Sequence, residues 1–463
     1  MTSPHRLRVA IITENFLPEL DGITVTLIHL LAYLNAQGVE TLLLGPQSGM
    51  KTYAGCALVG ASGFPLRAYP GLKINFIPMS FFDTLCGFSP DVIHLVDPIW
   101  LGIQALTAFK ILLPGIPLVT SHDTNLPTYS TIYGFPYFRR RAWRVLRRVH
   151  SIAECTFVPS HSTATLLSEK GYANLRVCDR GVDVDSFNVP GALKPRHPEK
   201  LGLTSRRRRS PVRGATEPGE ESLASGRKLL PPSSRSQRFV GDGPLKAPLR
   251  RLCTTKNIRA VFLGALTGRA LGEAFASADI MSAPSFTETF GQVTLEALAS
   301  GLPVVGLYAE GTVDLITHLK NGLLLDVHAS DEVETNDLWQ PCSPLPPGTK
   351  IACYDTCAEL MRPSSDSFAF LATQYAALLE QLISNPTLRD NMAVAALSTA
   401  QEYPWNRCTQ KILDVYLKSS CTASNRGFVR FAQDVLMVGV AVLVAALSHL
   451  LFMVPTIADL LRR

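Results

Sequence analysis

Two carboxylates that could hold one ligand lie close together in the second half of the chain. Glu288 and Glu296 are eight residues apart in the segment SFTETFGQVTLEALASGLPVV, residues 285–305. Eight residues span about 12 Å along a helix, so these side chains cannot both bind one atom but could hold the two ends of an elongated ligand. With a phosphate-binding helix start between them, two such carboxylates would fit a nucleotide-sugar site. The alternative is an ordinary helix–strand unit whose glutamates face water.

The elements that would position these carboxylates follow from the apolar pattern. Apolar residues recur at helical spacing from Phe290 to Leu298, Gly301 and Pro303 end the helix, and an extended apolar run begins at Val304. A helix start presents backbone N–H groups and a positive dipole end to a phosphate. Here those groups would belong to Thr289, Phe290 and Gly291.

The segment 285–305 resembles the donor-site signature of retaining glycosyltransferases of family 4, in which seven residues separate two glutamates. The flanking segments ALGEAFASADIMSAPS (270–285) and GLYAEGTVDLI (306–316) extend the resemblance. It implies an α/β fold of the GT-B type, with two Rossmann-like domains facing each other across a cleft. It further implies that Glu288 binds the donor sugar, that Glu296 binds the ribose, and that the next loop faces the donor through Glu310, Gly311 and Thr312.

Composition excludes several other classes. The net charge of +6 over 463 residues is modest and partly confined to one tract, so no nucleic-acid partner is expected. The ten cysteines form no CxxC pair, which disfavours zinc and favours a reducing compartment. The family needs no metal or other cofactor, and Asp183 and Asp185 flank the expected linker instead of forming a metal pair in a suitable loop.

The first domain is expected at residues 6–188 and would hold the acceptor. A short β-branched run at 9–12, a helical pattern over 28–38 and an apolar run at 41–44 form a βαβ unit. Gly22 would lie in the loop after the first strand, where the resemblance implies contact with the donor phosphate; the alternative is a turn glycine. This loop lacks the G-x-G-x-x-G pattern, which argues against a dinucleotide dehydrogenase.

A second polar turn follows the strand predicted at 117–120. Members of the family have a histidine directly before the threonine of this turn, where this chain has Asp123, with His122 one residue earlier. Adjacent residues of an extended segment point in different directions, so His122 does not simply replace that histidine. We count His122 and Asp123, with Glu288, as the candidate catalytic residues; His122 could instead only cap the turn.

A basic amphipathic helix is predicted at 135–154, in FPYFRRRAWRVLRRVHSIAE. Such a helix favours contact with a membrane surface or capture of an anionic acceptor, and the alternative is a solvated face.

Residues 189–238 depart from the family. They are rich in Arg, Ser, Pro, Gly and Glu and show no apolar strand or helical period, which is typical of a disordered segment. The family has the first strand and helix of the second domain here, with an arginine and a lysine that neutralise the donor diphosphate. Three explanations stay open: a disordered insertion, a reading-frame or exon artefact, which we favour, or a degenerate member of the family.

The missing cations have a consequence for activity. Each charge-assisted contact to a phosphate contributes about 1.5–3 kcal/mol, so the chain is predicted to be a weak or inactive transferase. The competing class is therefore a membrane-anchored pseudo-glycosyltransferase that binds or scaffolds. A nucleotide-sugar epimerase of the same fold is disfavoured by the apolar C-terminal stretch described next.

The remaining chain would comprise a nucleotide-sugar domain at 239–403, an elongated loop within 327–367, and a crossover helix at 404–418. Twenty residues at 435–454 contain only Ser448 and His449 as polar residues, which predicts a transmembrane helix. The N-terminal residues show no apolar signal core, so the catalytic body is expected in the cytosol, anchored by this helix. The resemblance implies a hexosyltransferase acting on a membrane lipid or glycan acceptor.

Overall fold

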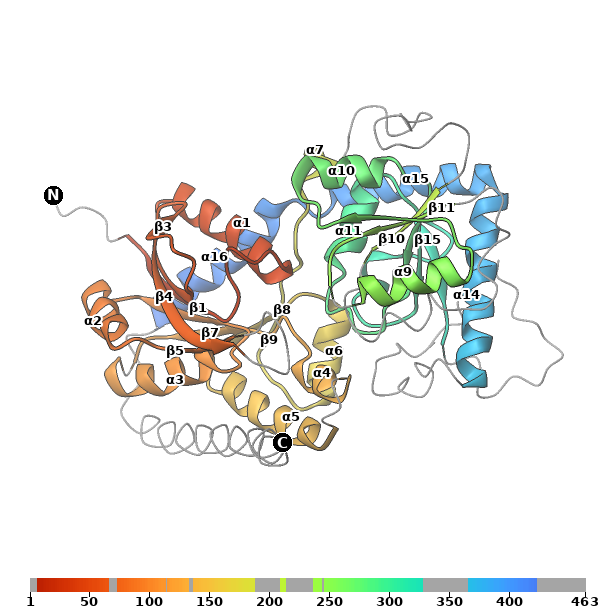
Figure 1. Cartoon of the computed structure of the whole chain (residues 1–463). Helices are drawn as coiled ribbons and strands as arrows, with labels where there is room; N and C mark the ends of the chain where they lie inside the picture. Colours follow the sequence, from red (N-terminus) through yellow and green to blue (C-terminus); the bar gives the residue numbers. More distant parts are fainter. Residues whose placement is uncertain are drawn as a thin grey trace.

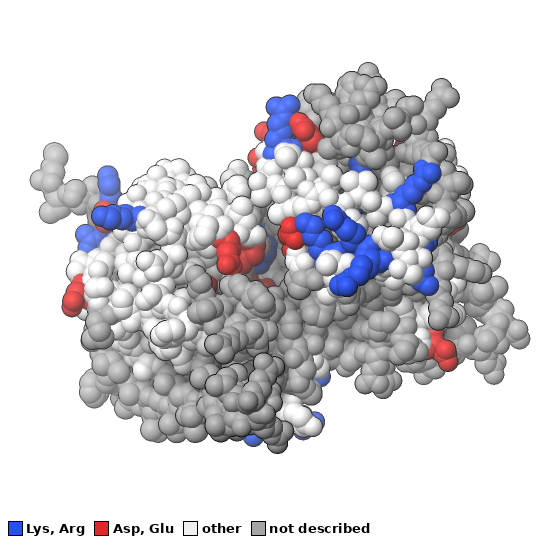
Figure 2. All heavy atoms as spheres, viewed as in Figure 1, with Lys and Arg blue, Asp and Glu red and all other residues white. Residues whose placement is uncertain are grey.

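The computed structural model describes residues 6–65, 73–113, 115–132, 136–187, 209–213, 236–243, 245–327 and 365–422. They form two α/β lobes, each built on its own sheet, and the last described helix crosses back from the second lobe to the first (Figure 1). A notch separates the lobes in the outline of Figure 2, and acidic side chains gather on that face where the lobes meet.

The first lobe is built on a mostly parallel sheet with strand order β3-β4-β2-β1-β6-β7-β8-β9. Only the pairs β3–β4 and β4–β5 are antiparallel among its described strands. The strands are β1 (Arg8–Thr13), β2 (Glu40–Pro46), β3 (Thr52–Tyr53), β4 (Cys56–Pro65), β5 (Lys73–Phe76), β6 (Val92–Val96), β7 (Leu118–Ser121), β8 (Cys155–Val158) and β9 (Leu175–Val177). The predicted strands at 9–12, 41–44 and 117–120 lie within β1, β2 and, with a one-residue shift, β7.

Both faces of this sheet are buried, which explains the continuous apolar runs. Val9 and Ile11 of β1 pack into one cluster with α1 and the last described helix, while Ala10 and Ile12 pack into another with α2 and α3. The helices of this lobe are α1 (Gly22–Ala36), α2 (Met79–Phe88), α3 (Leu101–Leu112), α4 (Leu126–Ile132), α5 (Pro136–Ser151), α6 (His161–Glu169) and α7 (Val184–Phe187).

Helix α1 begins earlier than the apolar pattern predicts. Gly22 is its first residue, so the prediction that Gly22 lies in a loop is wrong. The reason is a polar cap: the side chain of Asp21 accepts a hydrogen bond from the Thr24 amide at 2.7 Å. Residues 22–27 therefore form helix although the apolar period that marks it begins at Ile28.

The second lobe is built on a parallel sheet with strand order β12-β11-β10-β13-β14-β15. Its strands are β10 (Arg209–Arg213), β11 (Ser236–Val240), β12 (Ala260–Gly264), β13 (Met281–Ala283), β14 (Val304–Leu307) and β15 (Gly322–Leu325). Its helices are α9 (Lys246–Thr255), α10 (Gly268–Ala276), α11 (Gln292–Ala299), α12 (Thr312–Leu315), α14 (Asp366–Ser384) and α15 (Pro386–Gln401). Basic side chains gather over α9 on the face drawn in Figure 2.

The tract 189–238 contains a strand, contrary to the prediction that the first strand of this domain is missing. Strand β10 pairs in parallel with β11 along its length and with β13 at Val212. A sheet position between two strands is held by main-chain hydrogen bonds, which residues with polar side chains also supply, so the apolar pattern does not reveal it. Pro211 lacks an amide hydrogen and removes one donor from this ladder. The rest of the tract, apart from 236–238, lies outside the described residues.

The crossover helix α16 (Trp405–Thr422) covers the first lobe, as predicted for 404–418. Its Ile412, Leu413 and Tyr416 belong to the apolar cluster that contains β1 and α1. Within the described ranges, none of the helices has the length and apolar character needed to cross a membrane. The predicted span at 435–454 and most of the predicted loop at 327–367 lie outside those ranges.

Candidate active site

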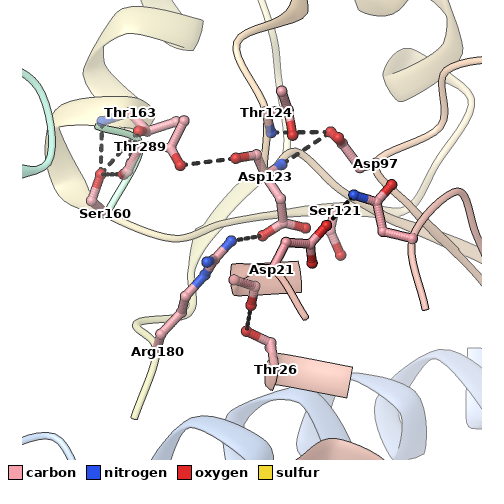
Figure 3. Close-up of polar contacts among 12 residues, drawn as sticks. Asp21, Thr26, Asp97, Ser121, Asp123, Thr124, Ser160, Thr163, Arg180 and Thr289 are labelled. Carbon is pink, nitrogen blue, oxygen red and sulfur yellow. Dashed lines mark hydrogen bonds and ion pairs between the residues drawn. The ribbon is translucent and has the colours of Figure 1, made fainter. Parts of the chain in front are cut away.

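The loop that precedes α11 lies against the polar turn that follows β7 (Figure 3). The hydroxyl of Thr289 donates a hydrogen bond to the carbonyl of Asp123 at 2.8 Å. The carbonyl of Thr289 accepts hydrogen bonds from Ser160 at 2.6 Å and from Thr163 at 2.9 Å, both at the start of α6. Two regions predicted separately to bind the donor and the reacting sugar are thus brought together across the lobes.

Asp123 lies at the centre of a buried charge cluster. Its carboxylate accepts a hydrogen bond from Nη2 of Arg180 at 3.1 Å, and both side chains are almost buried. Asp97, directly after β6, accepts hydrogen bonds from the amides of Asp123 at 3.2 Å and Thr124 at 3.1 Å. Burial, and secondarily the negative charge of Asp123, raises the pKa of Asp97 to about 7. Asp97 can therefore hold a proton close to neutral pH.

His122 faces away from this cluster. Its Nε2 lies 3.2 Å from Oδ1 of Asn125, and its ring stacks on Trp143 and meets Tyr172 edge-on. The side chain is 1% exposed, and burial lowers its pKa, which favours the neutral imidazole. The alternation of side chains along extended backbone places Asp123 and His122 on opposite sides. This position fits the alternative that His122 only caps the turn, and its catalytic role stays a prediction.

Gly22 lies under the guanidinium of Arg180. A Cβ atom built on Gly22 would overlap with Nη1 of Arg180, so the side chain of Arg180 can occupy this position only because residue 22 is glycine. The predicted donor contact at Gly22 and the charge pair at Asp123 are therefore parts of one site.

The predicted donor loops of the second lobe pack backbone to backbone. The amide of Gly311 donates to the carbonyl of Glu288 at 2.6 Å, and a Cβ on Gly311 would lie 2.6 Å from the Phe290 amide nitrogen. Gly291 precedes α11 with a φ of 90°, a conformation that favours glycine. The side chain of Phe290 is in the core, so only its backbone can contribute to a ligand site.

Three further predicted donor residues are buried close to these loops. Glu296 in α11 is 9% exposed, and Thr312 at the start of α12 is fully buried. Glu310 is 4% exposed, and both its carboxylate oxygens lie 3.3 Å from Nδ2 of Asn125 in the first lobe. Asp97 and Glu310 have φ angles of 47° and 29°, which are uncommon for residues other than glycine and are typical of functional sites.

Asp314 adds a contact across the lobes that the sequence did not indicate. Its carboxylate accepts hydrogen bonds from the amides of His161 at 2.9 Å and Ser162 at 3.2 Å, in the first turn of α6. A carboxylate at a helix N-terminus is stabilising. A second hydrogen bond links α11 to the segment after β9: the side chain of Gln292 donates to the carbonyl of Gly181 at 3.0 Å. The lobes are thereby held together in this structure.

The basic helix α5 borders a surface hollow. Trp143, Leu146 and Val149 are buried against the first lobe, as the amphipathic pattern predicts. A hollow of about 700 Å³ lies beside this helix, lined by Tyr137, Arg139, Arg140, Trp143, Arg144, Arg147 and Lys170. Within the part of the chain that the structure describes, no group of three or more His, Cys, Asp or Glu side chains could hold a metal ion.

Comparisons with known proteins cover both lobes. The family model described as Glycosyltransferase Family 4 matches residues 20–186, and the one described as glycosyl transferases group 1 matches residues 232–336. A GDP-mannose-dependent α-mannosyltransferase from Mycobacterium tuberculosis is 34% identical over 341 residues, covering 69% of this chain and 84% of that protein. The sulfoquinovosyl transferase SQD2 from Arabidopsis thaliana is 31% identical over 304 residues, covering 64% of this chain and 58% of that protein.

Solved structures share the arrangement of the two lobes. Sucrose-phosphate synthase from Thermosynechococcus elongatus superposes with a TM-score of 0.65 at 16% identity, covering 89% of this chain and 99% of that chain. At this identity the likeness establishes the fold alone, and it confirms the predicted pair of facing α/β domains.

Proposed function

Since the chain belongs to glycosyltransferase family 4 and has the GT-B fold, we propose that it moves a hexose from a nucleotide sugar to a membrane lipid or lipid-linked glycan, with retention of configuration. Membership of the family makes the chain a glycosyltransferase, as the sequence predicts. The donor, the acceptor and the stereochemical course are the proposed parts.

The observation that carries the proposal is the hydrogen bond between Thr289 and the carbonyl of Asp123. It places the donor loop of the second lobe directly against the turn at the carboxyl end of β7, which is where ligands bind in open parallel sheets. A sugar held by Glu288 would then face the first lobe, and a ribose would lie towards Glu296. Positioning and stabilisation of the leaving diphosphate would supply most of the rate enhancement.

GDP-mannose is the first donor to test. Its support is the name of the Mycobacterium tuberculosis relative, which is 34% identical over 69% of this chain. Two features support a membrane acceptor: the arginine-lined hollow beside α5, and the apolar stretch at 435–454, which we propose anchors a cytosolic catalytic body.

The test is donor hydrolysis by the full chain in detergent, screened over GDP-mannose, UDP-glucose, UDP-sulfoquinovose and ADP-glucose. We expect the chain to hydrolyse one of these donors. The NMR spectrum of the first sugar released should show the α configuration that the sugar has in the donor. The matched control is Glu288→Ala, which removes the carboxylate proposed to hold the sugar. Turnover that is absent for every donor would refute the transferase proposal and favour the non-catalytic binding protein.

A further inference from the structure

A nucleotide-sugar donor brings two phosphate charges into the site, and the sequence of residues 189–238 does not identify which of its arginines and lysines would meet them. Arg180 of the first lobe is a buried cation close to the predicted donor contacts. Its backbone is fixed on both sides: Asp179 pairs with Lys411 of α16 at 2.8 Å, and the Gly181 carbonyl accepts from Gln292 of α11. Residue 180 is therefore anchored to the donor lobe as well as to its own.

The guanidinium of Arg180 is only partly engaged. Nη2 donates a hydrogen bond to Asp123 (Figure 3). Nη1 lies over Gly22. Nε is buried and has no hydrogen-bond partner among the described residues. The arginine is 7% exposed, so this donor is withdrawn from bulk water without an acceptor. A buried N–H without an acceptor is costly, so a shift of this side chain that brings the N–H to an incoming anion would be favourable.

The start of α1 adds a second feature that favours an anion. Gly22 and Ile23 form the first turn of this 15-residue helix, where amide hydrogens and the positive end of the helix dipole point outwards. The guanidinium of Arg180 lies over this turn. Asp123, which pairs with Arg180, accepts a hydrogen bond from Thr289 in the predicted donor loop. A diphosphate reaching the donor loop would meet both.

We propose that Arg180, together with the first turn of α1, binds the donor diphosphate and supplies a cation for it from the first lobe. Asp123 neutralises Arg180 until the donor arrives, and the diphosphate then accepts a hydrogen bond from the guanidinium. This inference rests on the proposed function and names the phosphate-binding group of that same site.

The test compares the affinities of the full chain for GDP and for guanosine, measured by calorimetry. In Arg180→Gln we expect GDP to bind at least tenfold more weakly, because a charge-assisted contact is lost, while guanosine affinity is unchanged. Asp123→Asn should bind GDP at least as tightly as the unaltered chain, since it removes a competing negative charge. Arg176→Gln is the matched control, because Arg176 is an exposed arginine of the same segment.

The opposite effects of Arg180→Gln and Asp123→Asn on GDP affinity distinguish a phosphate contact from an ion pair that only stabilises the fold. If Arg180→Gln binds GDP as tightly as Arg176→Gln does, or if both Asp123→Asn and Arg180→Gln lose GDP affinity equally, the inference is wrong. The double variant Asp123→Asn, Arg180→Gln leaves no unpaired buried charge, and should lose GDP affinity as the single Arg180 variant does. An unaltered chain that binds no nucleoside diphosphate would overturn the proposed function as well.

Discussion

Replacing Asp97 by asparagine should change how the stability of the protein depends on pH. The asparagine oxygen can still accept the amides of Asp123 and Thr124, so the variant removes the ionisable proton and keeps the contacts. Burial raises the pKa of Asp97 from 3.8 to about 7. The folded protein therefore binds this proton more tightly than the unfolded chain, and the stability of the unaltered protein must fall as pH rises from about 4 to 7.

The magnitude follows from the width of that window. Each pKa unit corresponds to about 1.4 kcal/mol. Between pH 5 and pH 8 the unaltered protein should lose about 3 kcal/mol of unfolding free energy relative to Asp97→Asn. Other groups that titrate in both proteins cancel in this difference, including Glu14, whose pKa burial also raises to about 7.

The assay is urea denaturation of both proteins at pH 5 and pH 8, followed by tryptophan fluorescence. Thr128→Val is the control: it alters a buried polar residue of α4 without changing proton binding, so its effect should be the same at both pH values. An Asp97→Asn effect that is equally large at pH 5 and pH 8 would show that Asp97 does not carry a raised pKa, and the account of this cluster would be wrong.

Three other variants test separate contacts. Asp314→Ala removes the acceptor for two amides of α6 and should weaken the contact between the lobes by about 1 kcal/mol. Small-angle scattering without donor should then show a larger radius of gyration, and an unchanged radius would contradict this role of Asp314. Glu14→Gln removes a second carboxyl whose pKa burial raises to about 7. In the same denaturation assay, the unfolding free energy of this variant relative to the unaltered protein should increase between about pH 4.5 and 7 and stay constant below about pH 4.5. Gly22→Ala places a methyl group against Arg180 and should raise the KM for the donor several-fold; Gly87→Ala, whose added Cβ meets no neighbour, should leave KM unaltered, and equal KM values in the two variants would count against the site.

The apolar pattern predicts most elements of this fold because both sheets are buried on two faces. Val9 to Ile12 and Val304 to Leu307 are short apolar runs rich in β-branched residues, as expected of a covered parallel strand. Strand β10 escapes this reasoning because main-chain pairing holds it in place. The apolar period also misses the true start of α1, which the capping residue Asp21 marks in the local sequence.

The site is less predictable than the fold because its contacts join distant parts of the chain. Asp97 could have been found, since it directly follows a buried strand at the edge where ligands bind. The pairing of Arg180 with Asp123 joins residues 57 positions apart, and no local pattern encodes it. The contact of Asp314 with α6 spans 153 positions and depends on how the lobes meet.

Helix α16 makes the first lobe depend on the last described part of the chain. Cys408, Ile412 and Tyr416 fill the same cluster as β1 and α1, and the buried hydroxyl of Tyr416 lies 2.7 Å from Nδ1 of His94 in β6. During synthesis, the sheet of the first lobe emerges from the ribosome on the order of 10–50 s before this helix does, at about 5–20 residues per second. Until then the part of that sheet face that α16 covers is exposed, and only α1 shields the rest of it. The nascent first lobe should therefore require shielding by a chaperone, and a chain that ends before Trp405 should aggregate instead of folding into a separate domain.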